Sequence, residues 1–436
     1  MLPYNLRLAW HSIRRNPILS ALMVAAIGVG IGACMTTLTV YYMAAKNPIP
    51  HRSDRLFHVQ MDNYPITPSY EPGNEPPDQI SYTEATNLLR ANQGYRQAAM
   101  FKAAFPLQPK DPDIRPFLVL SRVTGNDFFS MFDVPFLFGG PWDDSADQSP
   151  AQVVVLSRST NDQVFGGENS VGREVRLGDR DFRVVGVIDD WAPSPKFYDL
   201  TNGAFLDVED TFVPFSLVEP LELDTSGNTN CSGNQQINSY AEFLASECTW
   251  ITYWVELPDR AAQEDFRTFI ENYITEQKAL GRFERAPNYR LRTVGEWLEA
   301  EEVADDHIKV VVWLSFLFLL VCLLNTVGLI LAKFIGRAPQ IALRRALGAS
   351  RATLFWQHLT EVLLIGAVGG LVGLGLAQLG LVGIRKVMGE DLAIFRMDWT
   401  MAGTAVLIAL MASAVAGAYP AFRVGRMAPA SFLKTQ

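Results

Sequence analysis

This sequence of 436 residues lacks the short motifs that mark most nucleotide-binding, metal-binding and hydrolytic proteins. It has no GxxxxGK[ST] phosphate loop, no HExxH zinc motif, no CxxC pair and no GxSxG nucleophile motif. It contains only 5 histidines, which are scattered along the chain at His11, His51, His58, His307 and His358. We therefore expect no catalytic site, no metal site and no bound cofactor in this chain, so that it is not an enzyme by itself.

Charge is absent from four long stretches, at residues 16–45, 310–332, 362–384 and 399–422. Each stretch is longer than the roughly 20 apolar residues that cross a ~30 Å hydrocarbon core. Buried helices of soluble proteins are usually interrupted by charge within that length. The pattern predicts four transmembrane helices.

The first of these stretches has a second interpretation, because basic residues precede it as they precede a signal peptide. It is too long for one, however, and no small-x-small cleavage site follows soon after Tyr41 and Tyr42. We therefore expect a retained membrane anchor.

Acidic residues are absent from three segments that flank the spans, at residues 1–15, 333–360 and 423–436, although all three carry arginine or lysine. Under the positive-inside rule this bias places all three in the cytoplasm. The long intervening region then lies outside, and most of the acidic residues belong to it. The predicted organisation begins with a cytoplasmic amphipathic helix (1–15), a first span (16–45) and a large extracytoplasmic domain (46–309). A second span (310–332), a cytoplasmic loop (333–360) and a third span (361–384) follow. The chain then continues with a short external loop (385–398), a fourth span (399–422) and a cytoplasmic tail (423–436).

The extracytoplasmic domain mixes two hydrophobic periods. Residues 152–156 and 182–188 are short valine-rich runs typical of strands, whereas residues 82–92 and 261–280 have helical spacing. We expect an α+β domain of two lobes. The fold class is therefore a multi-pass α-helical membrane protein with a large α+β extracytoplasmic domain.

Cysteine is rare, with 4 residues in the chain. Cys34 and Cys322 lie inside predicted spans, where a small apolar packing residue is the ordinary role. Cys231 and Cys248 flank a stretch rich in Ser, Asn and Gly, in an oxidising compartment. We predict a disulfide between them.

Small residues recur at spacings of four in two spans, as Gly28 and Gly32 and as Gly366 and Gly370. Such faces let helices approach closely. They predict either packing within one bundle or an interface with a second subunit, and the sequence alone does not decide between the two.

The cytoplasmic segment 337–350 reads RAPQIALRRALGAS and predicts a short helix. Pro339 suits its start and Gly348 its end. Its apolar residues are Ile341, Leu343, Ala346 and Leu347, and Arg344 and Arg345 lie near its end. The helix could push against a soluble cytosolic partner or lie on lipid headgroups.

This segment, continued by Glu361 at the head of the next span, resembles the FtsX-like permease signature of the MacB family. The match keeps residues 344–349 and Glu361 and departs at Gln340 and Ala342, where the family usually has Glu and Gly. Residues 153–190 are similar to the MacB-type periplasmic domain, and residues 419–429 to the family's closing motif.

The resemblance implies a permease subunit of an ABC transporter in a bacterial inner membrane. It implies that two permease subunits pair, identical or paralogous, and that a cytosolic ABC ATPase binding ATP and Mg docks on this chain. Closure of the ATPases then moves the extracytoplasmic domains, which exports or extracts a peptide, antibiotic, siderophore or lipoprotein. The expected ATPase-coupling residues are Ile341, Leu343, Arg344, Arg345, Ala346, Leu347, Gly348 and Glu361.

The short cytoplasmic segments leave no room for an ATP-binding domain, so we expect the ATPase on a separate polypeptide. A periplasmic adaptor and an outer-membrane channel are further partners that the sequence leaves undecided. We expect contact with membrane lipid and no binding of nucleic acid. The alternative function is an FtsX-like transmembrane signaller that regulates an extracytoplasmic cell-wall hydrolase, although the external domains of that branch tend to be smaller.

Overall fold

The computed structural model describes residues 2–66, 75–232, 236–388 and 399–425. The chain forms two compact units: the membrane unit, Met1–Ala45 with Ala304–Gln436, and the extracytoplasmic unit, Lys46–Val303. Most of the predicted external loop 385–398 and of the tail 423–436 lies outside the described residues.

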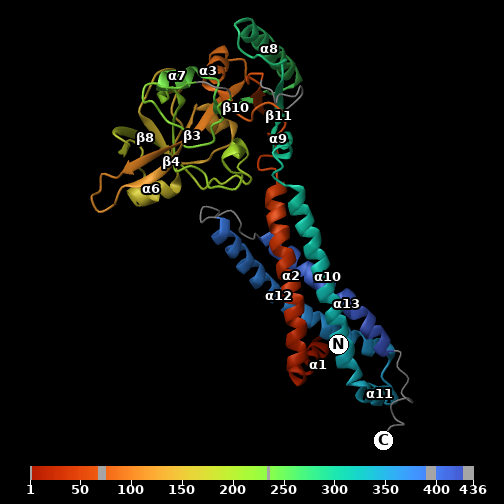
Figure 1. Cartoon of the computed structure of the whole chain (residues 1–436). Helices are drawn as coiled ribbons and strands as arrows, with labels where there is room; N and C mark the ends of the chain where they lie inside the picture. Colours follow the sequence, from red (N-terminus) through yellow and green to blue (C-terminus); the bar gives the residue numbers. More distant parts are fainter. Residues whose placement is uncertain (1, 67–74, 233–235, 389–398, 426–436) are drawn as a thin grey trace. The chain divides into compact units, whose positions relative to one another are not determined.

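All regular secondary structure among the described residues of the membrane unit is helical (Figure 1). Helix α2 packs along both α10 and α12, and α13 packs on α12. The helices are α1 (Leu2–Arg15), α2 (Pro17–Ala45), α10 (Asp306–Ile335), α11 (Ala338–Ala346), α12 (Arg351–Met388) and α13 (Trp399–Gly425).

Four of these helices are long and apolar enough to cross a membrane, over Pro17–Ala45, Asp306–Ile335, Arg351–Ile384 and Met401–Arg423. They also leave large apolar side chains uncovered. Trp313 of α10, for example, is 72% exposed and Leu314 is 58% exposed. Exposed apolar residues along a whole helix suit contact with lipid. The predicted multi-pass membrane fold is confirmed.

The glycine faces of the spans are used within this one chain. A Cβ on Gly28 would lie 2.9 Å from Val372 Cγ1, and one on Gly32 would lie 2.8 Å from Leu376 Cβ, so both glycines face α12. Gly366 and Gly370 face α13, where their added Cβ atoms would meet Ser413 and Ala409. Of the two interpretations left open by the sequence, the structure shows packing within the bundle for these four positions.

The extracytoplasmic unit is built on a mixed 11-stranded sheet with the order β11-β1-β10-β3-β4-β9-β6-β8-β5, to which β2 and β7 add at the side. Two of its pairings are parallel, β4 with β9 and β6 with β8. The strands are β1 (Leu56–Met61), β2 (Ile80–Ser81), β3 (Arg96–Gln108), β4 (Phe117–Thr124), β5 (Phe136–Gly139), β6 (Val153–Leu156), β7 (Glu174–Leu177), β8 (Arg180–Ile188), β9 (Thr211–Pro214), β10 (Thr249–Glu256) and β11 (Tyr289–Thr293).

Several helices of this unit begin at side chains that cap them. Ser81 caps α3, Asp259 caps α8, and Thr293 forms a capping box with Glu296 at α9. The helices are α3 (Tyr82–Ala91), α4 (Asp127–Met131), α5 (Asp144–Gln148), α6 (Arg158–Phe165), η1 (Phe197–Asn202), η2 (Phe215–Leu217), α7 (Tyr240–Ala245), α8 (Arg260–Ala279) and α9 (Val294–Ala300).

The α+β prediction for this unit is confirmed. The predicted strands at 152–156 and 182–188 are β6 and the end of β8, and the predicted helices are α3 and α8. The predicted two lobes share one connected sheet, and the buried apolar residues form two clusters. This arrangement places the unit's hydrophobic core on both sides of a single continuous layer.

Candidate functional site

Helix α11 forms the short element between the second and third spans. Arg337 precedes it and Pro339 lies in its first turn. At its end, Gly348 has a φ of +98°, a conformation that L side chains rarely adopt, and its N–H donates to Arg345 O at 3.1 Å. These signals explain why the chain forms a separate helix here.

The predicted apolar residues of α11 are divided between two faces. Ile341 is only 6% exposed and belongs to the buried cluster of the membrane unit, together with Phe334 and Leu354. Leu343 is 55% exposed and Leu347, which follows the helix, is 80% exposed. Ile341 therefore fixes α11 to α10 and α12, while Leu343 and Leu347 are available to a partner.

The other predicted coupling residues differ in exposure as well. Arg344, Ala346 and Gly348 are exposed, and Arg345 is half-buried. Arg344 Nη1 donates to Gln357 Oε1 at 3.2 Å, which joins α11 to the first turns of α12. The charged end of α11 is thus held by the span that follows it.

Glu361 is placed differently from the rest of the predicted coupling set. Its side chain is 5% exposed, and its Oε1 lies 2.7 Å from Lys333 Nζ of α10. Ser12 of α1 donates a hydrogen bond to the same oxygen, and Arg337 Nη1 lies 3.6 Å from it. Glu361 therefore holds α1, α10 and α12 together and is not itself exposed to a soluble partner.

Sequence reasoning missed the partners of Glu361. Lys333 is 1% exposed and also donates to Ser20 of α2 at 3.2 Å, while Arg337 donates to both the side chain and the carbonyl oxygen of Ser12. The only available signal was a lysine directly after an uncharged stretch of 23 residues, 310–332. We name Ser12, Lys333, Arg337 and Glu361 the cytoplasmic ion cluster.

A second buried ion cluster lies in the extracytoplasmic unit. Arg122 of β4 pairs with Asp199 and Glu209, and Lys196 Nζ lies 2.6 Å from Glu209 Oε1, with every side chain at most 3% exposed. Burial by itself raises the pKa of Glu209, but the Arg122 and Lys196 charges outweigh it and hold this pKa well below its usual value. We name Arg122, Lys196, Asp199 and Glu209 the extracytoplasmic ion cluster.

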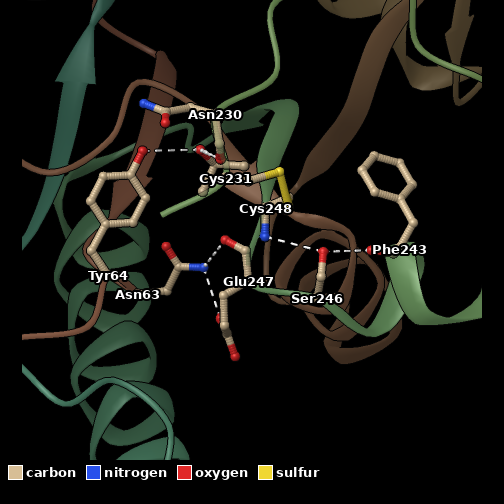
Figure 2. Close-up of a disulfide and its surroundings, with 9 residues drawn as sticks. Asn63, Tyr64, Asn230, Cys231, Phe243, Ser246, Glu247 and Cys248 are labelled. Atoms are coloured by element: carbon tan, nitrogen blue, oxygen red, sulfur yellow. Dashed lines mark hydrogen bonds between the residues drawn. A yellow bond between two sulfur atoms is a disulfide. The ribbon is translucent and has the colours of Figure 1, made fainter. Parts of the chain in front are cut away.

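A disulfide joins Cys231 and Cys248, whose Cα atoms are 4.2 Å apart, and Figure 2 shows its surroundings. Next to it, Asn230 pairs with Thr249 through backbone hydrogen bonds, and Glu247 accepts from the Asn63 side chain at 2.8 Å. Cys34 and Cys322 are free and buried in the membrane unit. The bond closes the loop between two segments that run to and from α7.

Among the described residues no group of three or more His, Cys, Asp or Glu side chains is arranged to hold a metal ion. In the membrane unit the described residues form the cytoplasmic ion cluster and the exposed pair Leu343 and Leu347.

Family comparisons agree with this layout. A model of the MacB-like periplasmic core domain matches residues 20–273, and a model of the FtsX-like permease C-terminal region matches residues 312–429. The chain belongs to the MacB/FtsX-like permease family. The family resemblance drawn from the sequence is confirmed, and the chain has the multiple candidate spans and the extracytoplasmic domain of that family.

Individual relatives of this permease are distant. The pyoverdine export ATP-binding/permease protein PvdT of Pseudomonas syringae pv. syringae is 22% identical over 99% of this chain and 59% of its own length. The macrolide export ATP-binding/permease protein MacB of Acinetobacter baylyi is 23% identical over 71% of this chain and 42% of its own length. The chain thus spans about half the length of these relatives.

One solved structure similar to this chain is the periplasmic region of MacB from Actinobacillus actinomycetemcomitans. It has a TM-score of 0.37 and 13% identity, and covers 58% of this chain and 95% of that one.

Proposed function

We propose that this permease transmits ATP hydrolysis by a cytosolic ABC ATPase to its extracytoplasmic unit, which thereby exports or extracts a substrate. The observation that carries the proposal is the divided surface of α11. Leu343 and Leu347 are exposed on the cytoplasmic side, while Ile341 fixes the same helix to two spans.

The exposed pair has the geometry of a docking face. Leu343 and Leu347 are four positions apart, so they project from one side of the helix end, and the Leu347 N–H donates to Leu343 O at 3.0 Å. Short helices with such apolar pairs bind in hydrophobic grooves of partner proteins. Arg344 and Arg345 add positive charge beside the pair.

The inner face of α11 supports force transmission. Ile341 shares a buried cluster with Phe334 of α10 and Leu354 of α12, and tightly packed side chains transmit displacement with little compression. Arg344 adds a polar link to Gln357. A push on α11 therefore moves the cytoplasmic ends of α10 and α12.

ATP and Mg belong to the ATPase in this proposal, because the 436 residues contain no phosphate-binding loop. A second permease subunit completes the membrane part, and the site of action is the bacterial inner membrane. The relatives' names mention macrolide and pyoverdine export. For this chain we propose a substrate from the wider set of peptides, antibiotics, siderophores and lipoproteins.

The test is to replace both exposed leucines, Leu343→Asp and Leu347→Asp, in the full-length tagged protein. Buried charge at a docking centre weakens binding by more than about 2 kcal/mol, so we expect at least about tenfold less ATPase activity in the purified complex. Leu280→Asp is the control, because Leu280 is 70% exposed in the extracytoplasmic unit. Unchanged co-purification of the ATPase with the double variant would contradict the docking role.

A second experiment separates transport from signalling. Replacing Arg344 and Arg345 by Glu removes the positive end of α11, and we expect cells to become sensitive to an exported compound. Septation defects with unchanged compound resistance would instead support the FtsX-like signaller.

A further inference from the structure

A pocket of about 170 Å³ lies at the cytoplasmic end of the membrane unit, between α1, α11 and α12. Its basic side chains are Arg15, Arg337 and Arg344, and its apolar wall includes Leu8 and Ile341. We call it the cytoplasmic pocket. All of its lining residues belong to one compact unit.

The charge of this pocket is not balanced by its own walls. Glu361 is the one carboxylate among the lining residues, and it lies 2.7 Å from Lys333, which already neutralises it. Arg337 shares the same carboxylate at 3.6 Å, so Arg15 and Arg344 remain without a carboxylate among the lining residues. An arginine side chain keeps its charge in proteins. The pocket therefore attracts an anion.

His358 supplies the second, independent observation. This pocket-lining residue is 5% exposed, yet neither of its ring nitrogens has a hydrogen-bond partner among the described residues. Its Nδ1 is 4.0 Å from Glu361 Oε2, and its ring packs on Phe334 with centroids 4.4 Å apart. A buried polar group left without a partner costs about 1–3 kcal/mol. Both nitrogens are shielded from solvent, so a ligand oxygen in the pocket gains this hydrogen bond once the ring turns toward it.

The position of the pocket along the chain points to the membrane surface. Arg15 directly precedes the uncharged stretch 16–45, and Glu361 directly precedes the uncharged stretch 362–384. The pocket thus lies at the level where spans enter the hydrocarbon, on the side that the positive-inside rule assigns to the cytoplasm. Basic pockets between spans on this side suit anionic lipid headgroups.

We propose that the cytoplasmic pocket binds the phosphate group of an anionic phospholipid from the cytoplasmic leaflet. Arg15 and Arg344 pair with the phosphate, the His358 ring donates to it, and the wall formed by Leu8 and Ile341 contacts the apolar part of the lipid. Such a lipid would join α1 to α11 and α12. The inference does not depend on the proposed docking of an ATPase.

The test measures lipid binding to the detergent-purified full chain by native mass spectrometry, with phosphatidylglycerol and with phosphatidylcholine. We expect selective retention of phosphatidylglycerol. Arg15→Gln and Arg344→Gln should each weaken it roughly five-fold, which corresponds to about 1 kcal/mol per basic residue. His358→Phe keeps an aromatic ring but removes both ring nitrogens, and it should also weaken phosphatidylglycerol binding.

The matched control is Arg351→Gln, which removes the same charge from an exposed position on the same side of the membrane, outside the pocket lining. An equal loss in this control, or equal binding of the two lipids, would overturn the inference in favour of general surface attraction. Displacement of phosphatidylglycerol by equimolar inorganic phosphate would show that the site takes free phosphate instead. Loss of ATPase co-purification in Arg15→Gln with lipid retention unchanged would assign the pocket to protein docking and overturn the lipid assignment.

Discussion

The two buried ion clusters of this permease use similar residues in different ways. In the extracytoplasmic ion cluster two cations meet two carboxylates, and all four side chains are at most 3% exposed. In the cytoplasmic ion cluster two cations, Lys333 and Arg337, share the single carboxylate of Glu361, and Arg337 is 16% exposed. The charges of the first cluster are balanced and shielded from solvent, whereas the second cluster keeps an excess of positive charge.

This difference matches the surroundings of each cluster. Burying ions in a protein interior is costly unless each charge is paired, and the extracytoplasmic ion cluster accordingly holds two charges of each sign. At the edge of a span, lipid headgroups and water can solvate the unpaired positive charge. A cluster that joins three helices and keeps one unbalanced cation can also change its partners when those helices move.

The largest expected effect comes from breaking the balanced cluster with Arg122→Met. It leaves Asp199 and Glu209 buried with less positive charge, and removing one partner of a buried ion pair costs about 3–5 kcal/mol. Denaturant unfolding of the extracytoplasmic unit, followed by tryptophan fluorescence in the full chain, measures the loss. Arg158→Met is the control: its pair with Asp189 is about 40% exposed on both sides, so we expect at most about 1 kcal/mol. Equal losses would show that the energetic cost does not depend on how deeply the ion pair is buried.

A smaller effect is expected from Glu361→Ala, because Arg337 is partly solvated and Lys333 keeps Ser20 as a partner. Loss of a charge-assisted hydrogen bond predicts about 2 kcal/mol of destabilisation of the membrane unit in detergent. Lys333→Met should cost a similar amount, and the double variant less than the sum of both. Additive losses in this cycle would mean that the two side chains do not depend on each other.

The smallest effect is a pH dependence at Glu301, a half-buried carboxyl in the extracytoplasmic unit. Burial, and after it the nearby Asp78 charge, raises its pKa from 4.5 to about 7 against the opposing effect of the Arg292 charge. The folded protein thus holds this proton more tightly than the unfolded chain. The stabilisation is fully present below about pH 4.5 and is lost as pH rises through 7.

We expect the thermal stability of the unchanged protein to decline between pH 5 and 8, and Glu301→Gln should flatten that decline. Glu302→Gln, at the exposed neighbouring position, should leave the profile as it is. An unchanged decline in Glu301→Gln would assign the pH dependence to other groups.

Much of the architecture could be predicted from local patterns. The four spans follow from stretches without charge, and the strands β6 and β8 follow from valine-rich runs between turn residues. Such signals depend on residues close together in the sequence. The end of α11 was also predictable from the sequence, because Gly348 adopts the left-handed conformation that glycine favours.

The candidate site was only partly predictable. The resemblance selected Ile341 and Leu343 together, but their opposite exposure depends on how α11 packs against α10 and α12. Lys333 was not selected at all, because its partner Glu361 lies 28 positions away and Ser12 lies in another helix.

The sequence by itself determined the spans, their orientation and the short helix between two of them, because hydropathy, charge bias and helix signals act over a few turns. Only the tertiary structure decided that Glu361 is an internal anchor, that the glycine faces serve packing within the chain, and that an uncompensated basic pocket forms beside α11. Those properties depend on which side chains, distant in sequence, are brought within contact distance, and on how much water each one loses.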